Sequence, residues 1–254
     1  MRLAEWLQQW LGRTQVRANT RASYGRAICT YTEPIGSKRL SQLTPAILQA
    51  WVDDMHRLSP RTVQYVHAIV RKALNDAVLL EMLPRNPAAG TMLRSVQRKP
   101  VRVLTRTEAR ALLAASGEHE ALFALALGCG LRMSEVLAVR HGSVQGTVLH
   151  VRESVKRAGS EVLVGPPKTP RSRRDIPIPA HVLPLLPHGP SDWFMFGGET
   201  PLSQWTVYSA WKRATAEADV QTKFHALRHS YASWLLEASV PVHKVSRLLG
   251  HASI

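Results

Sequence analysis

Residues 224–251 read FHALRHSYASWLLEASVPVHKVSRLLGH, and their spacing predicts two consecutive helices, over about 225–238 and 241–249, with a glycine as the stop. On the first helix His225 and Arg228 are three residues apart, so both project from one face. The opposite face is apolar and marks the core side, through Leu227, Tyr231, Leu235 and Leu236. The segment therefore joins a buried helix face to a basic, titratable one.

The residues upstream of this segment predict both helices and short strands. A capping box at Thr105-Arg-Thr-Glu108 opens a helix through about 115, an apolar helix follows over 120–127, and another is expected over 203–218. Between the last two, β-branched residues with Gly and Pro breaks predict three short antiparallel strands, over about 147–151, 161–165 and 174–178. This part of the chain is therefore expected to be α+β.

The first 95 residues predict helices and little else. Thr44-Pro45 and Ser59-Pro60 are signals for a helix cap followed by the first helical residue. We expect four helices, over about 2–12, 20–31, 45–57 and 60–82. The segment Pro84-Arg-Asn-Pro87 then breaks the last helix, and the polar, basic stretch Ser95–Pro100 is the best linker candidate.

The predicted fold is therefore mainly α, with a four-helix N-terminal domain over 1–95 and an α+β C-terminal domain over 96–254 that holds a small antiparallel three-stranded sheet. A chain of 254 residues that is 45% apolar can bury a core in each. Residues 1–95 hold 13 basic and 6 acidic side chains, hence +7, and residues 96–254 hold 20 and 12, hence +8. Both domains are basic, which favours a polyanionic partner such as nucleic acid over a small acidic metabolite.

Several classes of protein are disfavoured by composition. The longest apolar stretch, 121–131, is far too short to span a membrane, and residues 1–12 lack the apolar run of a signal peptide. The two cysteines, Cys29 and Cys129, are too few for a disulfide framework and form no CxxC pair. We expect a cytoplasmic protein associated with nucleic acid and not with a membrane.

Two more basic side chains stand in positions suited to chemistry. Arg132, within GLRMSE, begins a short helix, where its guanidinium can act as a rigid two-pronged donor; the alternative is a surface arginine paired with Glu135. Lys168, within PKTPRSR, lies between two predicted strands, and the alternative is a solvated hairpin tip. Lys156 and Arg171 are nearby alternatives to Lys168.

Together these positions suit a phosphodiester. Two arginines, two histidines and one lysine occur without an acidic pair for general acid–base work and without a phosphate-binding glycine loop. Such a set stabilises extra negative charge and can protonate a leaving oxygen. A zinc site from His225 and His229 is the alternative, but no HExxH glutamate follows the first histidine and the net charge repels a cation. We expect neither a metal nor another cofactor.

These motifs, in this order, resemble the catalytic domain of the tyrosine recombinases, the phage-integrase and Xer family. The resemblance covers about residues 100–254, and the helical, basic residues 1–95 are similar to the family's core-binding domain by pattern alone. It implies site-specific recombination, in which a tyrosine hydroxyl attacks a DNA phosphodiester to give a 3′-phosphotyrosyl link. The energy of the broken bond is kept in that link, so neither metal nor nucleotide is required.

Individual roles follow from the same resemblance. Arg132 and Arg228 would clamp the scissile phosphate. Lys168 would protonate the 5′-oxygen leaving group, His225 would assist proton transfer to and from the nucleophile, and His251 would hydrogen-bond a phosphate oxygen. Glu135 would be a structural support.

The implied partner is double-stranded DNA with inverted-repeat core sites, bound by a homo-tetramer at synapsis. Further phosphate contacts are expected from five basic residues, Arg61, Arg71, Lys72, Arg173 and Arg174.

One departure from the family pattern concerns the nucleophile. In the family a tyrosine lies about nine residues past the histidine of LLGH, roughly two and a half helical turns, and the sequence ends at Ile254. We therefore expect this chain to bind DNA without cutting it, with the tyrosine segment either removed or naturally missing. Tyr231, on the core side of its helix, is expected to pack and not to attack. The alternatives are a non-cleaving DNA-binding regulator and a type IB topoisomerase-like enzyme.

Overall fold

The computed structural model describes residues 1–97, 100–158, 161–167 and 170–250. The chain divides into two compact units, Met1–Lys99 (unit 1) and Pro100–Ile254 (unit 2). Each has its own hydrophobic core. Among the described residues, no helix has both the length and the apolar character needed to cross a bilayer.

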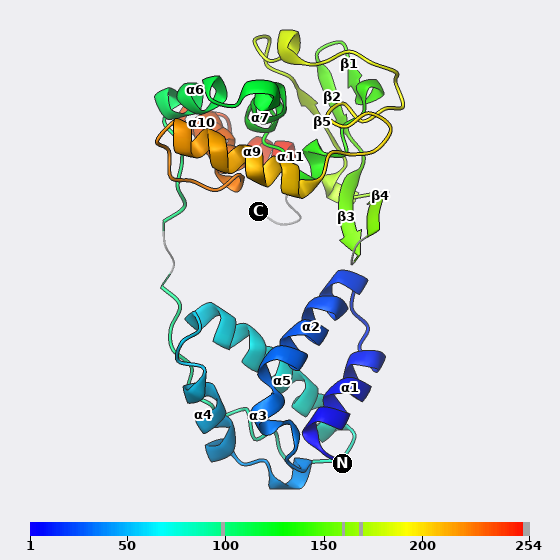
Figure 1. The fold of residues 1–254 in the computed structure, drawn as a ribbon, viewed down its shortest axis with the longest axis vertical. Coiled ribbons are helices and arrows are strands. Elements are labelled where there is room, and N and C mark those ends of the chain that lie inside the picture. The colour runs from blue at the N-terminus through cyan, green and yellow to red at the C-terminus, as the bar shows by residue number, and fades with distance from the viewer. Residues whose placement is uncertain (98–99, 159–160, 168–169, 251–254) are drawn as a thin grey trace. The chain divides into compact units, whose positions relative to one another are not determined.

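Unit 1 is helical, as predicted. Its helices are α1 (Leu3–Arg13), α2 (Ala18–Tyr31), α3 (Glu33–Gly36), α4 (Pro45–Asp54) and α5 (Pro60–Leu79), shown in Figure 1. Thr44 and Ser59 cap α4 and α5 through their side-chain oxygens, with proline in the first turn, which confirms both start signals. The four-residue α3 was not predicted, and α5 ends earlier than expected, because Leu80 leaves helical geometry and Glu81 has a φ of 57°.

Tryptophans fix the helices of unit 1 around α5. Trp6 and Trp10 of α1 are buried, and their indole nitrogens donate to the Ala73 carbonyl (2.9 Å) and to the Asp76 carboxylate (2.5 Å). Trp51 of α4 donates to the Tyr31 carbonyl at the end of α2 (2.8 Å). Each ring therefore buries its apolar body while its N–H keeps a partner.

Unit 2 is α+β, as predicted, and its sheet is smaller than its helical part. The helices are α6 (Arg106–Ala114), α7 (Glu120–Gly128), α8 (Met133–Val136), α9 (Gln204–Glu217), α10 (His225–Glu237) and α11 (Val242–Leu249). Antiparallel strands in the order β1-β2-β5 form the three-stranded sheet, namely β1 (Val144–Gln145), β2 (Val148–Val151) and β5 (Arg174–Pro177). Leu149 faces Ile176 in the register of β2 and β5, and both side chains are fully buried.

The prediction that strand 161–165 belongs to this sheet is wrong. It exists as β4 (Glu161–Gly165), but it pairs with β3 (Ser154–Ala158) in a separate two-stranded hairpin that projects from the sheet (Figure 1). Residue preference indicates a strand without saying which strand it pairs with. Two positions of β3 carry Lys156 and Arg157, and its sequence gave no strand signal.

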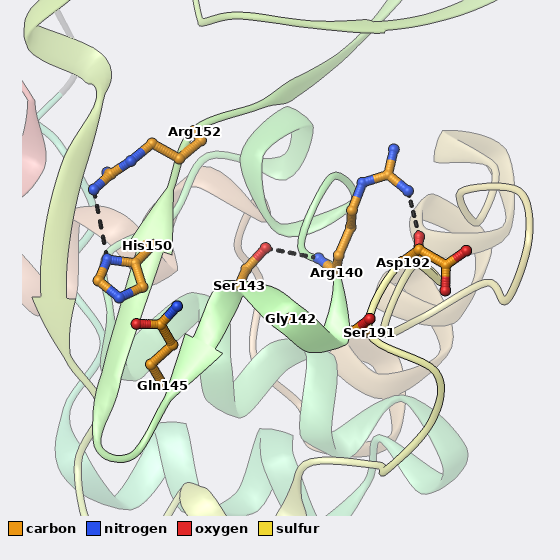
Figure 2. Close-up of a pocket in the computed structure, with 8 residues that line it drawn as sticks. All are labelled: Arg140, Gly142, Ser143, Gln145, His150, Arg152, Ser191 and Asp192. Carbon is orange, nitrogen blue, oxygen red and sulfur yellow. Dashed lines mark hydrogen bonds between the residues drawn. The ribbon is translucent and has the colours of Figure 1, made fainter.

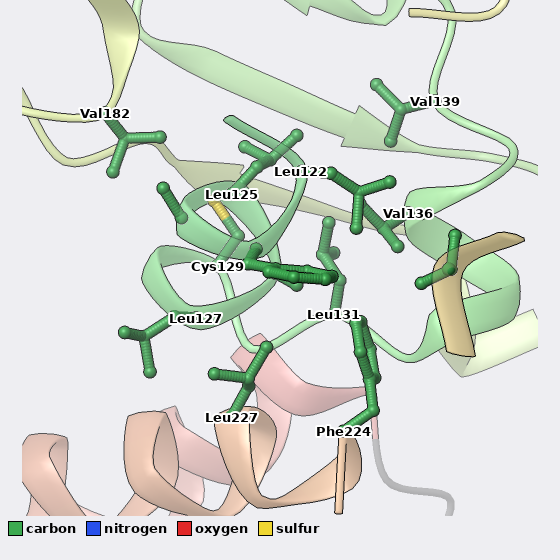
Figure 3. Close-up of a cluster of buried hydrophobic side chains, with 14 of the residues drawn as sticks. Leu122, Leu125, Leu127, Cys129, Leu131, Val136, Val139, Val182, Phe224 and Leu227 are labelled. Atoms are coloured by element: carbon green, nitrogen blue, oxygen red, sulfur yellow. The ribbon is translucent and has the colours of Figure 1, made fainter. Parts of the chain in front are cut away.

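The core of unit 2 is built around α7, whose residues Leu122–Leu127 are all buried (Figure 3). A helix that is apolar on every side must be covered on every side. α10 packs against it, and the rings of Phe123, Trp211 and Phe224 meet edge to face with centroids 5.2–6.0 Å apart. The start of α10, where His225 and Arg228 lie, is therefore packed against the core of the unit.

Candidate active site

Arg132 begins the short helix α8, as predicted. Its backbone N–H donates to the Glu135 carboxylate (3.0 Å), and its guanidinium donates to the same carboxylate (2.7 Å). The Arg132 side chain is 36% exposed, whereas that of Glu135 is 2% exposed. The pairing with Glu135 that the alternative interpretation predicted is therefore present, but the acidic member is buried and only the basic member reaches solvent.

Arg228 lies on the same side of the core and is buried. Its guanidinium donates to the Gly130 carbonyl (2.8 Å) and to the Leu249 carbonyl (2.5 Å), and it lies 3.8 Å from the Glu135 carboxylate. Burial, followed by the charge of Arg132, lowers the pKa of Arg228 to about 9. Arg132 and Arg228, distant in sequence, thus meet at one carboxylate.

Arg174, for which a phosphate contact is predicted, is buried beside Glu135. Its side chain is 4% exposed and forms two hydrogen bonds with Glu135, at 2.9 and 3.1 Å. The basic run around it suggested a solvated cluster, but residue 174 points inward at the start of β5, where a buried acid neutralises it. Arg173, by contrast, is exposed.

Glu135 is charged at this site. Its burial opposes ionisation, but the hydrogen bonds and charge of Arg174 and the contacts of Arg132 lower its pKa below the ordinary value. The carboxylate is the only acidic group that the two arginines of α8 and β5 share among the described residues. Glu135 therefore holds Arg132 and Arg174 together, which fits the structural support expected of it.

His225 and His229 form an adjacent pair on α10, with ring centroids 4.6 Å apart. The pKa of His225 is lowered, chiefly by burial and then by His229 and Arg228. The pKa of His229 is lowered by burial and by Arg228. A lowered pKa keeps His225 uncharged near neutral pH, so that its ring can accept a proton.

A groove of about 730 Å³ opens beside His225, between α8, α9 and the segment before α10. Trp205 and Tyr208, three residues apart on α9, line it and are 75% and 56% exposed. Lys212 and Lys223 complete its basic side. No sequence motif marks these four residues, and the usable signal was a pair of large aromatic residues, Trp205 and Tyr208, three positions apart on one predicted helix.

A second pocket, shown in Figure 2, lies beside β1 and β2 and contains Arg140, His150 and Arg152. Each of its two arginines already pairs with an acidic side chain. Arg140 pairs with Glu153 (2.9 Å) and donates to the Asp192 carbonyl, and Arg152 pairs with Asp175 (2.5 Å). This pocket is therefore a weaker candidate for binding a phosphate than the region around Arg132.

Lys168 and His251 lie outside the described residues, so their places in the site are not described. Lys156, the substitute for Lys168, donates from β3 to the Pro166 carbonyl (2.7 Å). Residue 251 follows Gly250, whose φ of 66° ends α11 as predicted. An added Cβ at Gly250 would lie 3.1 Å from the Arg171 carbonyl oxygen, so the end of α11 packs directly against the residues before β5.

The remaining predicted DNA contacts lie in unit 1. Arg61, Arg71 and Lys72 are all exposed on α5, and the Lys72 ammonium lies 6.0 Å from the centroid of the Trp10 ring. No group of three or more His, Cys, Asp or Glu side chains suited to a metal ion occurs in the described part of the chain.

Relatives of known sequence are integrases and recombinases. The chain is 25% identical to the integrase of Mycobacterium phage L5, over 99% of this chain and 72% of that protein. It is 26% identical to a XerC-like tyrosine recombinase of Caldanaerobacter subterraneus, over 77% of this chain and 60% of that protein. Across the first relatives the chain spans between 50% and 72% of their length.

Solved structures share the fold at low sequence identity. The Tn1549 transposon integrase in complex with circular intermediate DNA superposes with a TM-score of 0.84, at 18% identity, covering 100% of this chain and 93% of that one. The lambda integrase tetramer bound to a Holliday junction gives 0.76 at 18% identity, covering 100% and 75%. Residues 102–254 match the profile of the phage integrase family, and because this match covers more than half of the sequence, the chain belongs to that family.

Proposed function

We propose that this chain is the DNA-binding and phosphate-activating part of a site-specific tyrosine recombinase. The observation that carries the proposal is the meeting of Arg132 and Arg228 at the buried Glu135 carboxylate, beside His225. Two fixed guanidinium groups stabilise the negative charge that develops on a phosphate under attack. A neutral histidine next to them can take the proton of the attacking hydroxyl.

Lys168 and His251 complete the proposed chemistry. Lys168 would give a proton to the departing 5′-oxygen, and His251 would hydrogen-bond a phosphate oxygen. Support comes from their positions in sequence, because Lys168 precedes the segment that contacts the end of α11, and His251 follows the glycine that makes this contact. The proposed reaction uses neither a metal nor a nucleotide.

The DNA surface is proposed to include both units. In unit 2 the groove beside His225 offers lysines for phosphates and exposed aromatic rings, Trp205 and Tyr208, for bases or sugars. In unit 1 the exposed cations of α5 are available to phosphates, namely Arg61, Arg71 and Lys72. Unit 1 would thus act as the core-binding domain, and Arg173 would add a contact from unit 2.

The nucleophile is proposed to lie outside the tyrosines of this sequence, so that the chain by itself binds DNA and does not cut it. Tyr231, on α10, is buried against Gly130, and burial raises its pKa to about 12, which disfavours the attacking phenolate. Tyr24 stacks on Trp10, and the Tyr65 hydroxyl is bonded to Ser23. Tyr208, exposed in the groove beside His225, is the one to test directly.

Selection of bound fragments from random duplex DNA, followed by footprinting, tests the function. We expect one recurrent sequence in inverted orientation. Binding without sequence preference, together with relaxation of supercoiled plasmid, would instead favour the topoisomerase-like alternative. Arg132→Ala should leave selection of the site nearly intact, because it removes one phosphate contact among many.

Covalent trapping on a nicked duplex of the selected sequence tests the role of the nucleophile. We expect tight binding and no covalent protein–DNA product with this chain. A covalent product that persists in Tyr231→Phe and disappears in Tyr208→Phe would show that the nucleophile lies on α9 and would overturn the non-cleaving proposal.

At synapsis four copies are proposed to act together, by analogy with the lambda integrase tetramer on a Holliday junction. The mass of the complex on a synthetic four-way junction carrying the selected sites checks this. Four chains per junction are expected, and two would contradict the proposal.

A further inference from the structure

The Glu135 carboxylate joins three basic side chains from three elements. Both of its oxygens accept from the Arg174 guanidinium, at 3.1 and 2.9 Å, while one accepts from the Arg132 guanidinium at 2.7 Å. The Arg228 guanidinium lies 3.8 Å away. Because a shared carboxylate fixes the angle between the groups that bind it, the direction of Arg132 depends on where Arg174 holds Glu135.

Arg174 also holds the end of α11. Its Nε donates to the Leu248 carbonyl (2.6 Å), and Arg228 donates to the Leu249 carbonyl (2.5 Å). The last carbonyls of a helix have no partner within that helix, so these two arginines satisfy what α11 leaves open. The fit is close, since an added Cβ at Gly250 would lie 3.2 Å from the Arg174 side chain.

We propose that Arg174 is a positioning residue of the phosphate clamp, which ties β5, α8 and the end of α11 into one arrangement and so fixes Arg132 toward the phosphate. The proposal rests on the proposed function, because it takes Arg132 to be a phosphate ligand. Arg174 itself does not touch DNA. Each of its three guanidinium nitrogens already donates within the protein, to Leu248, Ser172 or Glu135, and these bonds direct the side chain inward.

Two substitutions of Arg174 separate its charge from its geometry. Arg174→Lys keeps the charge but loses the planar fork that reaches a carboxylate and a carbonyl together. Arg174→Met removes the charge and leaves the buried Glu135 and Arg228 as a balanced pair, so that this variant can fold without an excess buried charge. Arg173→Met is the matched control, since the neighbouring residue is exposed.

Phosphate binding at Arg132 gives the first readout. Inorganic phosphate is titrated at constant ionic strength into protein with ¹⁵N-labelled arginine, and the Arg132 side-chain signals are followed. We expect both Arg174 variants to weaken phosphate binding at Arg132 by about tenfold, because a displaced ligand loses alignment. A folded Arg174 variant whose affinity at Arg132 equals that of the unmodified protein would overturn the positioning role.

The unmodified protein provides a separate test. Its Arg132 signals are expected to respond to phosphate; if they do not, the clamp of the proposed function fails first, and the positioning role fails with it. The guanidinium protons of Arg174 are expected to exchange slowly with water, and fast exchange would overturn the proposal without the use of any variant.

The salt dependence of binding to duplex DNA gives the second readout. Removal of one phosphate contact lowers the slope of log affinity against log salt by about 1. We expect this further reduction when Arg173→Met is added to Arg132→Ala and not when Arg174→Met is added, because the contact that Arg174 positions is already absent in Arg132→Ala. An equal reduction in both would show that Arg174 contacts DNA directly, which would overturn the proposal.

Discussion

The two units of the chain use their arginines in opposite ways. In unit 1 the cations of α5 stay at the surface, and the buried side chains are mainly apolar, with three tryptophans whose N–H groups each find a partner. In unit 2 the core includes Glu135, Arg174 and Arg228, all less than 5% exposed at their side chains. Unit 1 is therefore held by burial of apolar surface, whereas unit 2 also depends on a buried charge network beside its candidate site.

This difference between the units indicates that the candidate site, and not stability alone, accounts for the buried charges of unit 2. Buried ion pairs contribute little net stability compared with well-packed apolar groups, but losing one partner is costly. The network therefore makes more sense as a means of orienting Arg132 and Arg228 than as a contribution to the free energy of folding. The comparison predicts that charge substitutions damage unit 2 and that cavity-forming substitutions damage unit 1.

The largest expected effect is that of Glu135→Gln. It leaves two buried guanidinium groups without their carboxylate and should destabilise unit 2 by about 3–5 kcal/mol. Hydrogen exchange followed by mass spectrometry measures each unit separately, and unit 1 should be unaffected. Asp175→Asn is the control, because its pair with Arg152 is exposed and should contribute at most about 1 kcal/mol. Equal losses in the two variants would remove the distinction between buried and surface pairs.

Leu74→Ala is the corresponding test of unit 1. Leu74 is fully buried on α5, so truncation leaves a cavity and should cost about 3 kcal/mol in unit 1 alone. Leu79→Ala, at the end of the same helix, removes a side chain that is 79% exposed and should change the unfolding free energy little. Denaturant unfolding followed by exchange in each unit checks both variants, and a loss that spread to unit 2 would show that the two units do not unfold independently.

A smaller effect is expected at the junction of α11 with β5. Gly250→Ala places a side chain at a φ of 66° and close to Arg171, Ser172 and Arg174, and should destabilise unit 2 by about 1–2 kcal/mol. Gly12→Ala is the control, because residue 12 lies inside α1 with nothing within 4 Å of the added methyl, and it should stabilise unit 1 by about 0.5–1 kcal/mol. The unfolding free energies of the two variants should therefore move in opposite directions.

The part of the fold that sequence could predict is the part that local rules determine. The starts of α4 and α5 depend on the cap-and-proline pairs Thr44-Pro45 and Ser59-Pro60, and the start of α6 depends on the capping box at Thr105. Each signal needs only a few neighbouring residues. The pairing of β4 with β3 needs a partner whose own sequence gave no strand signal, so local patterns could not predict it.

In the candidate site, too, some features follow from local sequence and others depend on residues far apart in the chain. The motif order indicated Arg132, His225 and Arg228, and the structure places them together. The burial of Arg174 depends on Glu135, 39 residues away, and on Leu248, 74 residues away, which no pattern around residue 174 reveals. The sequence motifs therefore indicate which basic residues belong to the candidate site, but they do not indicate which of these residues are buried and which are exposed.

The smallest expected effect concerns pH. The pKa values of His225 and His229 are lowered from 6.5 in the folded chain, chiefly by burial, so below that pH the unfolded state binds more protons than the folded state. Stability of unit 2 should therefore be complete above pH 6.5 and should fall as the pH drops from there toward the lowered values. His229→Gln removes one of these groups and one neighbouring charge from His225, so the loss on acidification should be smaller than in the unmodified chain.

Unfolding of unit 2, measured on both sides of pH 6.5, checks this expectation. His243→Gln is the matched control, because that histidine is exposed on α11. Unit 1 provides an internal comparison, since burial also lowers the pKa of His67, whose Nε2 has no hydrogen-bond partner among the residues that the structure describes. His67 should make unit 1 sensitive to acid in the same direction, and His229→Gln should not alter that sensitivity. If His229→Gln left the acid sensitivity of unit 2 unchanged, the histidine pair would not be the source of that sensitivity. The carboxylate of Glu135 would then be the next group to test, because its lowered pKa also predicts loss of stability in acid.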